Sequence, residues 1–280
     1  KLKYYKIKKY FKMIEPHIPN ELRVETIQLP KFLCPLYETD LIRIGKDHDG
    51  GYLIPKQSLN QTKLLYSFGL SDDWSFEEEF YNKTSAKIIC YDHTVNWKLF
   101  LKVFLRDFKS LFKYFKYRAF FDGKNKIHEK KIICPVGTII PPGYPVLKED
   151  KIVDLNSILI DYSSNSFFFK IDIEGSEYRI LEQLIKYASC MTGLVIEFHD
   201  CDLHHLRIKN FIENFDLQLV HIHVNNWGFV TPNRFPQSLE LTFSPKQFNK
   251  KITNESKKFP ISLDQPNNPA FQDQSIDFQD

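Results

Sequence analysis

Short apolar runs alternate with amphipathic helical patterns through most of this 280-residue chain. Runs of aromatic and branched aliphatic residues, bounded by polar residues or glycine, predict strands at 64–70, 87–93, 130–137, 167–172, 193–200, 217–228 and 238–245. Helical patterns separate most of these runs, which predicts a parallel sheet with helices on both faces. No helical pattern separates the last two runs, so the last strand is predicted to be antiparallel. The sequence therefore predicts an α/β, Rossmann-like fold with a seven-stranded, mostly parallel sheet.

A different pattern precedes the first of these strands. Residues 41–54, LIRIGKDHDGGYLI, place two apolar runs around a turn rich in Asp and Gly, which predicts a hairpin or a bent loop. Gly50 and Gly51 permit backbone conformations that let a ligand approach closely. An ordinary surface turn explains the same two glycines equally well.

Three regions fall outside the alternation. Residues 1–40 combine a basic amphipathic helix with a linker punctuated by prolines, and 96–122 place phenylalanines and basic residues on opposite faces of a predicted helical insertion. Residues 249–280 form a tail, of which roughly the last fifteen are expected to be poorly ordered. The single predicted domain covers 41–248. Its insertion could contact a membrane surface, but packing on the sheet with a solvated lysine face is favoured.

Composition changes this picture little. The content of 42% hydrophobic and 26% charged residues is ordinary for a globular protein, and the net charge of +3 is too small to indicate nucleic-acid binding. The five cysteines form no CxxC pair, which favours reduced thiols over a zinc site. The chain contains no run of eighteen apolar residues and no signal-peptide pattern, so a cytoplasmic protein is expected.

Polar side chains gather at the carboxyl ends of four predicted strands. These residues are Asp92, then Asp172 and Glu174, then Glu197, His199 and Asp200, and finally His223, Asn225 and Asn226. The carboxyl ends of parallel strands meet at one edge of a sheet, where open α/β sheets bind their ligands. The four strand ends therefore predict one shared cleft.

The first strand and the turn after it resemble the opening unit of a nucleotide-binding fold. An apolar run ends at Gly69, and a helical pattern follows. Asp92 stands about 20 positions later, the spacing at which such folds place an acidic residue that binds ribose hydroxyls. The chain lacks the GxGxxG pattern, so this segment alone is a weak indication.

Residues 170–177, KIDIEGSE, resemble the KIDVEGxE signature of FkbM-type methyltransferases, which use S-adenosylmethionine. The segments RIGKDHDGGYLI, YSFGLSDDWSFE, VDLNSIL, HIHVNNWG and LELTF are similar to one branch of these proteins, and together they cover roughly 40 to 245. The resemblance implies a class I methyltransferase fold whose last strand is antiparallel. The chain departs from the family's glycine-rich first motif, because FGLSDD stands there.

The resemblance also implies roles for particular residues. Ser67 and Gly69 would form the first cofactor loop, Asp92 would hold the ribose, and Gly50 and Gly51 would complete part of the pocket. Asp172 would lie near both the methionine end of the cofactor and the acceptor. The predicted acceptor-binding residues are Glu174, Asp200, Asn225 and Asn226.

Methyl transfer to a hydroxyl gains from a base that takes its proton. The candidates are His223, His199 and Asp172, and His223 is favoured because two asparagines follow it closely. His221 alternates with His223 on the strand, and a structural role within the strand explains it equally well.

A divalent metal is the other interpretation of these residues, but it is not favoured because no compact ligand motif is present. Its potential ligands are Asp172, Glu174, His199, Asp200, His221 and His223.

The preferred function is a SAM-dependent O-methyltransferase acting on a small polar acceptor, such as a sugar or a surface-glycan precursor. An anionic acceptor would suit the basic face of the insertion. The first alternative is a metal-dependent glycosyltransferase, for which the available acidic pairs are Asp172-Ile-Glu174 and Asp47-His-Asp49. The second alternative is a non-catalytic module that binds membrane surfaces through its basic segments.

Overall fold

The computed structural model describes residues 25–95, 110–121, 125–128, 131–132, 152–159, 166–252 and 258–279. The predicted helix at the start of the chain lies outside these residues, as does the part of the basic insertion at 96–109. The rest of the insertion includes helix α5 (Ser110–Phe121). No described helix has both the length and the apolar character needed to cross a membrane.

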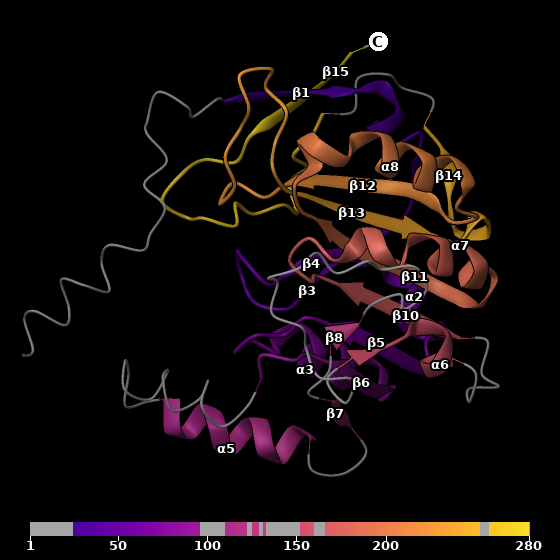
Figure 1. Cartoon of the computed structure of the whole chain (residues 1–280), viewed down its shortest axis with the longest axis vertical. Helices are drawn as coiled ribbons and strands as arrows, with labels where there is room; N and C mark the ends of the chain where they lie inside the picture. The colour runs from indigo at the N-terminus through magenta and orange to yellow at the C-terminus, as the bar shows by residue number, and fades with distance from the viewer. Residues whose placement is uncertain are drawn as a thin grey trace, which may run out of the picture.

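A seven-stranded sheet forms the centre of the molecule (Figure 1). In spatial order its strands are β12 (Gln218–Val224), β13 (Leu239–Ser244), β11 (Met191–Phe198), β10 (Phe167–Ile171), β5 (Leu64–Phe68), β6 (Lys87–Tyr91) and β7 (Lys126–His128). Strand β13 is antiparallel to both of its neighbours, whereas the pairs from β11 to β7 are parallel. The predicted seven-stranded sheet with an antiparallel last strand is therefore confirmed.

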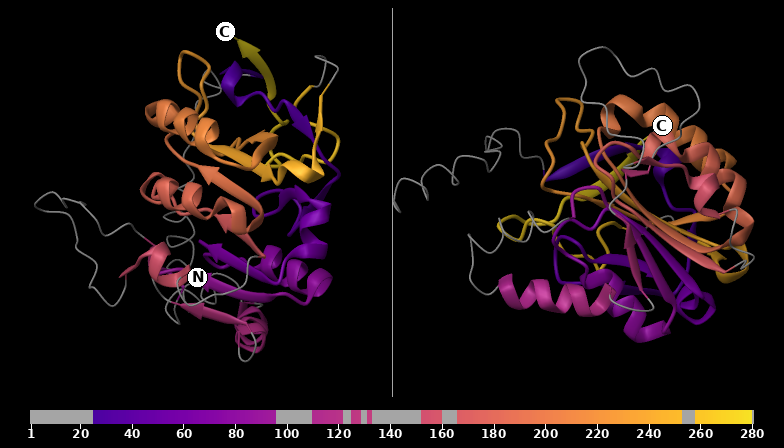
Figure 2. Two further views of the ribbon diagram at one scale, coloured as in Figure 1. Left: turned by 90° about the vertical axis from the view of Figure 1, so that its right-hand side faces the viewer. Right: turned by 60° about the horizontal axis from the view of Figure 1, so that its bottom comes forward.

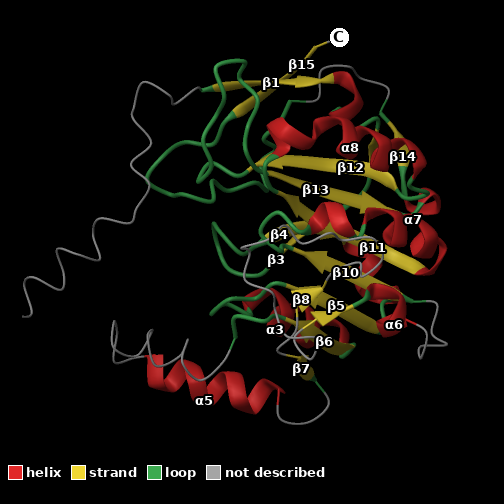
Figure 3. Ribbon diagram, in the orientation of Figure 1, coloured by secondary structure: helices red, strands yellow, loops and turns green. Residues whose placement is uncertain are grey.

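Apolar side chains on both faces explain why the central strands are buried. Phe167, Phe169 and Ile171 pack in one core with helices α6 (Leu155–Leu159), α7 (Leu181–Tyr187) and α8 (Cys201–Asn214). Phe168, which points to the opposite face, packs in a second core with Phe80 of α3 (Ser75–Thr84). Helix α2 (Lys56–Gln61) lies on the same face as α3, so helices cover both sides of the sheet (Figures 2 and 3). The continuous FFF run is the pattern of a strand that is buried on both faces.

The third strand is not the predicted one. The run at 130–137 was expected to join the sheet, but β7 at Lys126–His128 does so, through residues 89–91 of β6. The described part of the predicted run, β8 (Lys131–Ile132), instead pairs with β9 (Ile152–Val153) in a separate two-stranded sheet. An edge strand pairs on one side only and can be short and polar, so the more apolar neighbouring run was a misleading signal.

The predicted hairpin before the sheet is confirmed. Strands β3 (Leu41–Ile44) and β4 (Tyr52–Pro55) pair antiparallel around the DHDGG turn. Strand β4 is buried along its whole length, and the carbonyl oxygen of Leu53 accepts a hydrogen bond from Thr242 Oγ1 of β13 at 2.7 Å. The hairpin is thereby fixed beside the carboxyl ends of the central strands.

The described part of the tail is ordered, contrary to expectation. Strand β15 (Ser275–Gln279) pairs in parallel with β1 (Thr26–Pro30), and β14 (Lys250–Lys251) pairs with β2 (Tyr37–Glu38). The segment is polar, but its acids and amides pair with buried polar groups of the sheet, such as Asp264 with His221 and Asn267 with Glu240. Composition alone predicted disorder because these partners are distant in sequence.

Candidate functional site

A cleft of about 610 Å³ opens at the carboxyl ends of β5, β6, β10 and β11 and is bounded by the hairpin turn. In Figure 3 the loops at this edge of the sheet lie on the left of the view. The predicted residues that line the cleft are Gly50, Gly69, Asp92, Asp172, Glu174, His199 and Asn225. Other lining residues, which have no predicted role in the preferred function, include Asp49, Tyr52, Lys170, Glu197 and Trp227. The predicted convergence of the strand ends on one cleft is therefore seen in the structure.

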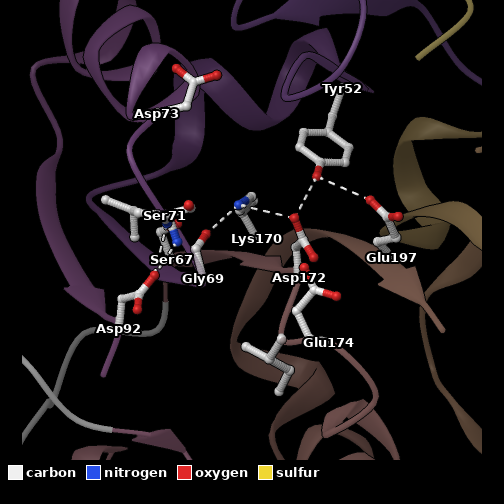
Figure 4. Close-up of polar contacts among 12 residues, drawn as sticks. Tyr52, Ser67, Gly69, Ser71, Asp73, Asp92, Lys170, Asp172, Glu174 and Glu197 are labelled. Carbon is white, nitrogen blue, oxygen red and sulfur yellow. Dashed lines mark hydrogen bonds and ion pairs between the residues drawn. The ribbon is translucent and has the colours of Figure 1, made fainter. Parts of the chain in front are cut away.

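The loop after β5 contacts the end of β10. Gly69 has φ +85°, and a Cβ at this position would lie 1.6 Å from the carbonyl oxygen of Asp172. Its amide donates to the carbonyl of Tyr91, and its own carbonyl accepts from Lys170 Nζ at 2.5 Å (Figure 4). Only glycine fits this conformation and this close approach.

Asp92 fixes the same loop from β6. Its Oδ2 accepts hydrogen bonds from the amides of Leu70 and Ser71 at 2.8 and 2.9 Å, and its Oδ1 accepts from the amide and hydroxyl of Thr94, both at 2.6 Å. Burial raises the pKa of this carboxyl, but the bonds from Thr94, Leu70 and Ser71 outweigh burial and lower the pKa below its ordinary value. Asp92, which was predicted to bind ribose, thus uses both carboxylate oxygens in hydrogen bonds within the protein.

Ser67 lies beneath the loop rather than in the cleft. Its side chain is fully buried and donates to Oε1 of Glu77, which is also buried, at 2.5 Å. Burial raises the pKa of Glu77, although Lys170 and the Ser67 bond oppose the rise. Ser67 was predicted to contact a cofactor, but it instead supports α3, the first helix after the loop.

Lys170 brings a positive charge to the floor of the cleft. It comes from the middle of the apolar β10, and Nζ lies 3.9 Å from Oδ2 of Asp172 and 5.6 Å from the centre of the Tyr52 ring. Burial lowers the pKa of a lysine, but the charges of Asp172, Glu77 and Glu197 outweigh burial and raise it. Lys170 is therefore a buried cation that balances surrounding acids.

A tyrosine links two carboxylates across the cleft. The hydroxyl of Tyr52 lies 3.2 Å from Oδ2 of Asp172 and 3.3 Å from Oε2 of Glu197 (Figure 4). Asn225 Nδ2 donates to Oε1 of Glu197 at 2.7 Å. Burial, together with the charges of Asp172 and Glu240, raises the pKa of Glu197 well above its ordinary value. The raised pKa favours a protonated Glu197 beside the Tyr52 hydroxyl.

His199 faces the same acids from the end of β11. Its Nδ1 lies 3.1 Å from Oε1 of Glu177, and its Nε2 lies 3.5 to 3.9 Å from Glu174, Glu197 and Asp172. Burial lowers the pKa of this imidazole, but the Glu177 bond and the surrounding negative charges raise it to about 10. The surrounding acids thus favour a positive charge at this ring nitrogen, which argues against His199 as the general base.

His223, the favoured base, does not line the cleft. Its ring is buried, with Nδ1 3.2 Å from Glu240 and Nε2 2.9 Å from Asp273. His221 pairs in the same way with Asp264 at 2.9 Å. Strand β13 lies between β12 and β11, so the end of β12 is one strand further from the cleft than its sequence order indicated. Both histidines have structural partners, and neither is available as a base.

The remaining predicted residues also hold the chain together. Asp200, with φ +50°, stands at the start of α8, and its Oδ1 accepts from Gln237 at 3.4 Å. Asn226 exchanges hydrogen bonds with the backbone of Asn268. Gly51 approaches the carbonyl oxygen of Lys46, where a Cβ would lie at 2.1 Å. None of these three lines the cleft, so their predicted contacts with ligands have no support in this geometry.

Two of the missed residues had a visible signal. Lys170 is a charge inside an otherwise apolar strand, and Glu197 belongs to a strand-end cluster. Tyr52 had none beyond its place after the glycine pair, because its role depends on the hairpin packing against β11 and β13.

No family model and no curated protein matches this chain. Among solved structures, a proposed RNA methyltransferase from Pyrococcus horikoshii aligns at 11% identity and TM-score 0.37, over 67% of this chain and 76% of that chain. A precorrin-6y C5,15-methyltransferase from Geobacter metallireducens aligns at 14% and 0.33, over 68% and 86%. A proposed tRNA (m1A22) methyltransferase from Streptococcus pneumoniae, in complex with S-adenosyl-L-methionine, aligns at 11% and 0.36, over 72% and 76%.

Similarities of this size carry no argument about this chain, so the fold assignment rests on its own topology. When its strands are numbered in chain order from β5, the sheet reads β7-β6-β5-β10-β11 as 3-2-1-4-5, the order of doubly wound folds. The antiparallel β13, the seventh strand, lies between the fifth and the sixth. The central sheet therefore has the topology of the class I methyltransferase fold.

Proposed function

We propose that this protein is a SAM-dependent methyltransferase that transfers a methyl group to an oxygen of a small polar acceptor, such as a sugar. The observation that carries the proposal is the acid-lined cleft at the carboxyl ends of the strands in this topology. Ligands of open α/β sheets bind at this edge. The volume of about 610 Å³ lies within the usual range for a small-molecule site.

The charge of the cleft supports a cofactor that is itself net positive. Asp49, Asp172, Glu174 and Glu197 all line it. S-adenosylmethionine carries a sulfonium and an ammonium against one carboxylate, so an acidic lining favours it electrostatically. Lys170, a buried cation that lines the cleft, would attract that single carboxylate.

The loop that begins at Gly69 would allow a cofactor to approach the protein backbone closely. Residues 69–71 line the cleft, and Asp92 accepts hydrogen bonds from the amides of Leu70 and Ser71. Tyr91 lines the same end, with its ring stacked on Phe68 at 5.5 Å and on His128 at 4.8 Å. An aromatic wall of this kind suits an adenine ring. A ribose hydroxyl could reach Asp92 by displacing the Thr94 hydroxyl.

The cofactor would supply an electrophilic methyl group on sulfur. The chain would contribute mainly alignment, since in-line displacement depends on the geometry of the two reactants. We assign proton removal from the acceptor hydroxyl to Asp172, whose side chain reaches the cleft and is 28% exposed. Tyr52 would orient this carboxylate, and the neighbouring Glu197, with its raised pKa, would hold a proton and so reduce repulsion.

The sugar-like acceptor is supported by the mixture of groups beside Asp172. Asn225 and Gln237 offer amides, while Trp227, which is 43% exposed, offers an aromatic face. Amides bind hydroxyls, and an indole packs against the apolar face of a sugar ring. The strongly acidic lining makes an anionic acceptor less suitable than a neutral or cationic one.

Calorimetry of the full chain with S-adenosylmethionine and S-adenosylhomocysteine tests the cofactor. We expect saturable binding of both compounds. Asp172→Asn should lower the cofactor affinity by no more than about tenfold, because this residue serves the acceptor more than the cofactor. Failure of the wild type to bind either compound would overturn the proposal. Binding of a nucleoside-diphosphate sugar in its place would favour the glycosyltransferase alternative. Methyl transfer is then assayed with labelled cofactor against monosaccharides and their nucleotide-linked forms.

A further inference from the structure

We propose that Asp172, Glu174 and His199 form a binding site for a divalent cation of the Mn²⁺ class at the acceptor end of the cleft. Each residue offers one ligand atom, and these atoms all lie within 4.8 Å of one another. Asp172 and Glu174 come from the turn after β10, and His199 comes from the turn after β11. The two strands are adjacent, so the sheet itself brings the ligands together.

The imidazole is oriented as metal-binding histidines are. Glu177, which is fully buried, accepts amide hydrogen bonds from Ile173 and Gly175, and the same Oε1 lies 3.1 Å from His199 Nδ1. A carboxylate on one ring nitrogen fixes the ring and directs the other nitrogen toward the ligand site.

The other ring nitrogen points into a group of carboxylates without bonding closely to any of them. Nε2 lies 3.5 Å from Glu174, 3.6 Å from Glu197 and 3.9 Å from Asp172. These separations are longer than an ordinary hydrogen bond, so Nε2 lies among three carboxylates and is bonded closely to none of them. A cation among them would contact all three ligand atoms directly, with Glu197 as a buried neighbour whose side chain is 5% exposed.

Charge favours the same conclusion. Four carboxylates, those of Asp172, Glu174, Glu177 and Glu197, surround His199. Lys170 Nζ lies 3.9 Å from Asp172. Acids therefore outnumber bases in this part of the cleft, and a divalent ion would balance them. Carboxylate oxygens with one imidazole nitrogen suit Mn²⁺ or Mg²⁺ better than a softer ion.

Fewer residues can bind the cation than the sequence indicated. His221 and His223 are paired with acids of the tail. Asp200 accepts a hydrogen bond from Gln237 and lies outside the group of ligand atoms, so these three residues do not contribute. Asp172, Glu174 and His199 all line the cleft, so an acceptor could reach a cation among them. Contact between the cation and an acceptor rests on the proposed function, whereas binding of the cation does not.

The test is titration of the full chain, freed of metal with a chelator, with Mn²⁺ followed by electron paramagnetic resonance and calorimetry. We expect one saturable site per chain, with competition by Mg²⁺. Glu174→Gln is the main variant because its side chain is 87% exposed and the change should not disturb folding. It should weaken Mn²⁺ at least about tenfold. His199→Gln should weaken it further, and Glu182→Gln, an exposed acid on α7, is the matched control that should bind as the wild type does.

Absence of saturable Mn²⁺ binding, or wild-type affinity in both ligand variants, would overturn the site. S-adenosylmethionine binding is measured separately in excess chelator. Cofactor binding without Mn²⁺ binding would remove the metal site and leave the proposed function standing. Mn²⁺ binding without cofactor binding would overturn the proposed function and leave the metal site standing.

Discussion

Gly69 and Asp172 approach so closely that a single methyl group cannot be placed between them. A Cβ at position 69 would lie 1.6 Å from the carbonyl oxygen of Asp172 and 2.8 Å from its carbonyl carbon. The first residue after β5 and the first after β10 thus touch through their backbones. This contact sets the distance between the Gly69 loop and the acids of the cleft.

We expect Gly69→Ala to be among the most damaging substitutions in the chain. It combines a clash with fixed backbone and a φ of +85°, which L side chains rarely adopt. Each effect costs about 1 kcal/mol or more, and a clash of this size costs more, so a loss of about 4 kcal/mol is expected. Urea unfolding measures the loss. The control is Gly175→Ala, where φ is also positive but a Cβ would meet only a side-chain oxygen of Asp200, at 3.5 Å. Equal stability losses in the two variants would contradict the clash argument.

Ser67→Ala separates a structural role from a cofactor-binding role. The substitution leaves the buried Oε1 of Glu77 without its 2.5 Å hydrogen bond. An unsatisfied buried acceptor costs about 1–3 kcal/mol, so stability should fall by that amount. Cofactor affinity, measured by calorimetry well below the unfolding temperature, should change little because Ser67 does not line the cleft. Ser189→Ala, at an exposed position, is the control for stability. A large loss of affinity with unchanged stability would restore the original assignment.

Asp92→Asn should disorder the Gly69 loop as well as weaken cofactor binding. The carboxylate accepts four hydrogen bonds from Leu70, Ser71 and Thr94, and an amide would oppose some of these donors with a donor of its own. We expect a destabilisation of about 1–3 kcal/mol, seen as a lower thermal midpoint, together with weaker binding of S-adenosylhomocysteine. Thr94→Val removes only the hydroxyl bond and should have a smaller effect on stability. Weaker binding without any loss of stability in Asp92→Asn would favour a direct ribose contact instead.

The sequence was informative about Asp172, Glu174 and His199 because each follows a strongly apolar strand, and parallel strand ends must meet at one edge. It misled about His223 for two physical reasons. The chain crosses back so that β13 separates β12 from β11, and the tail then covers the β12 face with Asp264 and Asp273. A polar tail with few apolar residues has no local signal for such pairing, since its partners lie about fifty positions or fewer upstream on another element.

The pH dependence of stability offers a direct test of the tail. Asp264, whose side chain is 2% exposed, lies 2.9 Å from His221 Nε2 and accepts a hydrogen bond from the amide of Ile261 at 2.7 Å. Burial raises the pKa of this carboxyl, but the bond and charge of His221 and the charge of His223 outweigh burial and lower the pKa below its ordinary value of 3.8. Since the folded-state pKa lies below the unfolded one, the carboxylate stabilises the fold above about pH 4. That contribution is lost as pH falls from there through the lowered pKa.

Asp264→Asn should therefore destabilise the protein at pH 7 by about 1.5–3 kcal/mol, the range for a hydrogen bond to a charged group. The difference from the wild type should shrink as the pH is lowered from 5 toward 3, because the wild-type carboxylate becomes protonated and loses the same interaction. Urea midpoints measured across this range provide the test. Asp216→Asn is the control, since this acid is 75% exposed in its ion pair with Lys246 and should show no such convergence. A constant difference across the whole range would mean that Asp264 stabilises the tail through shape rather than through its charge.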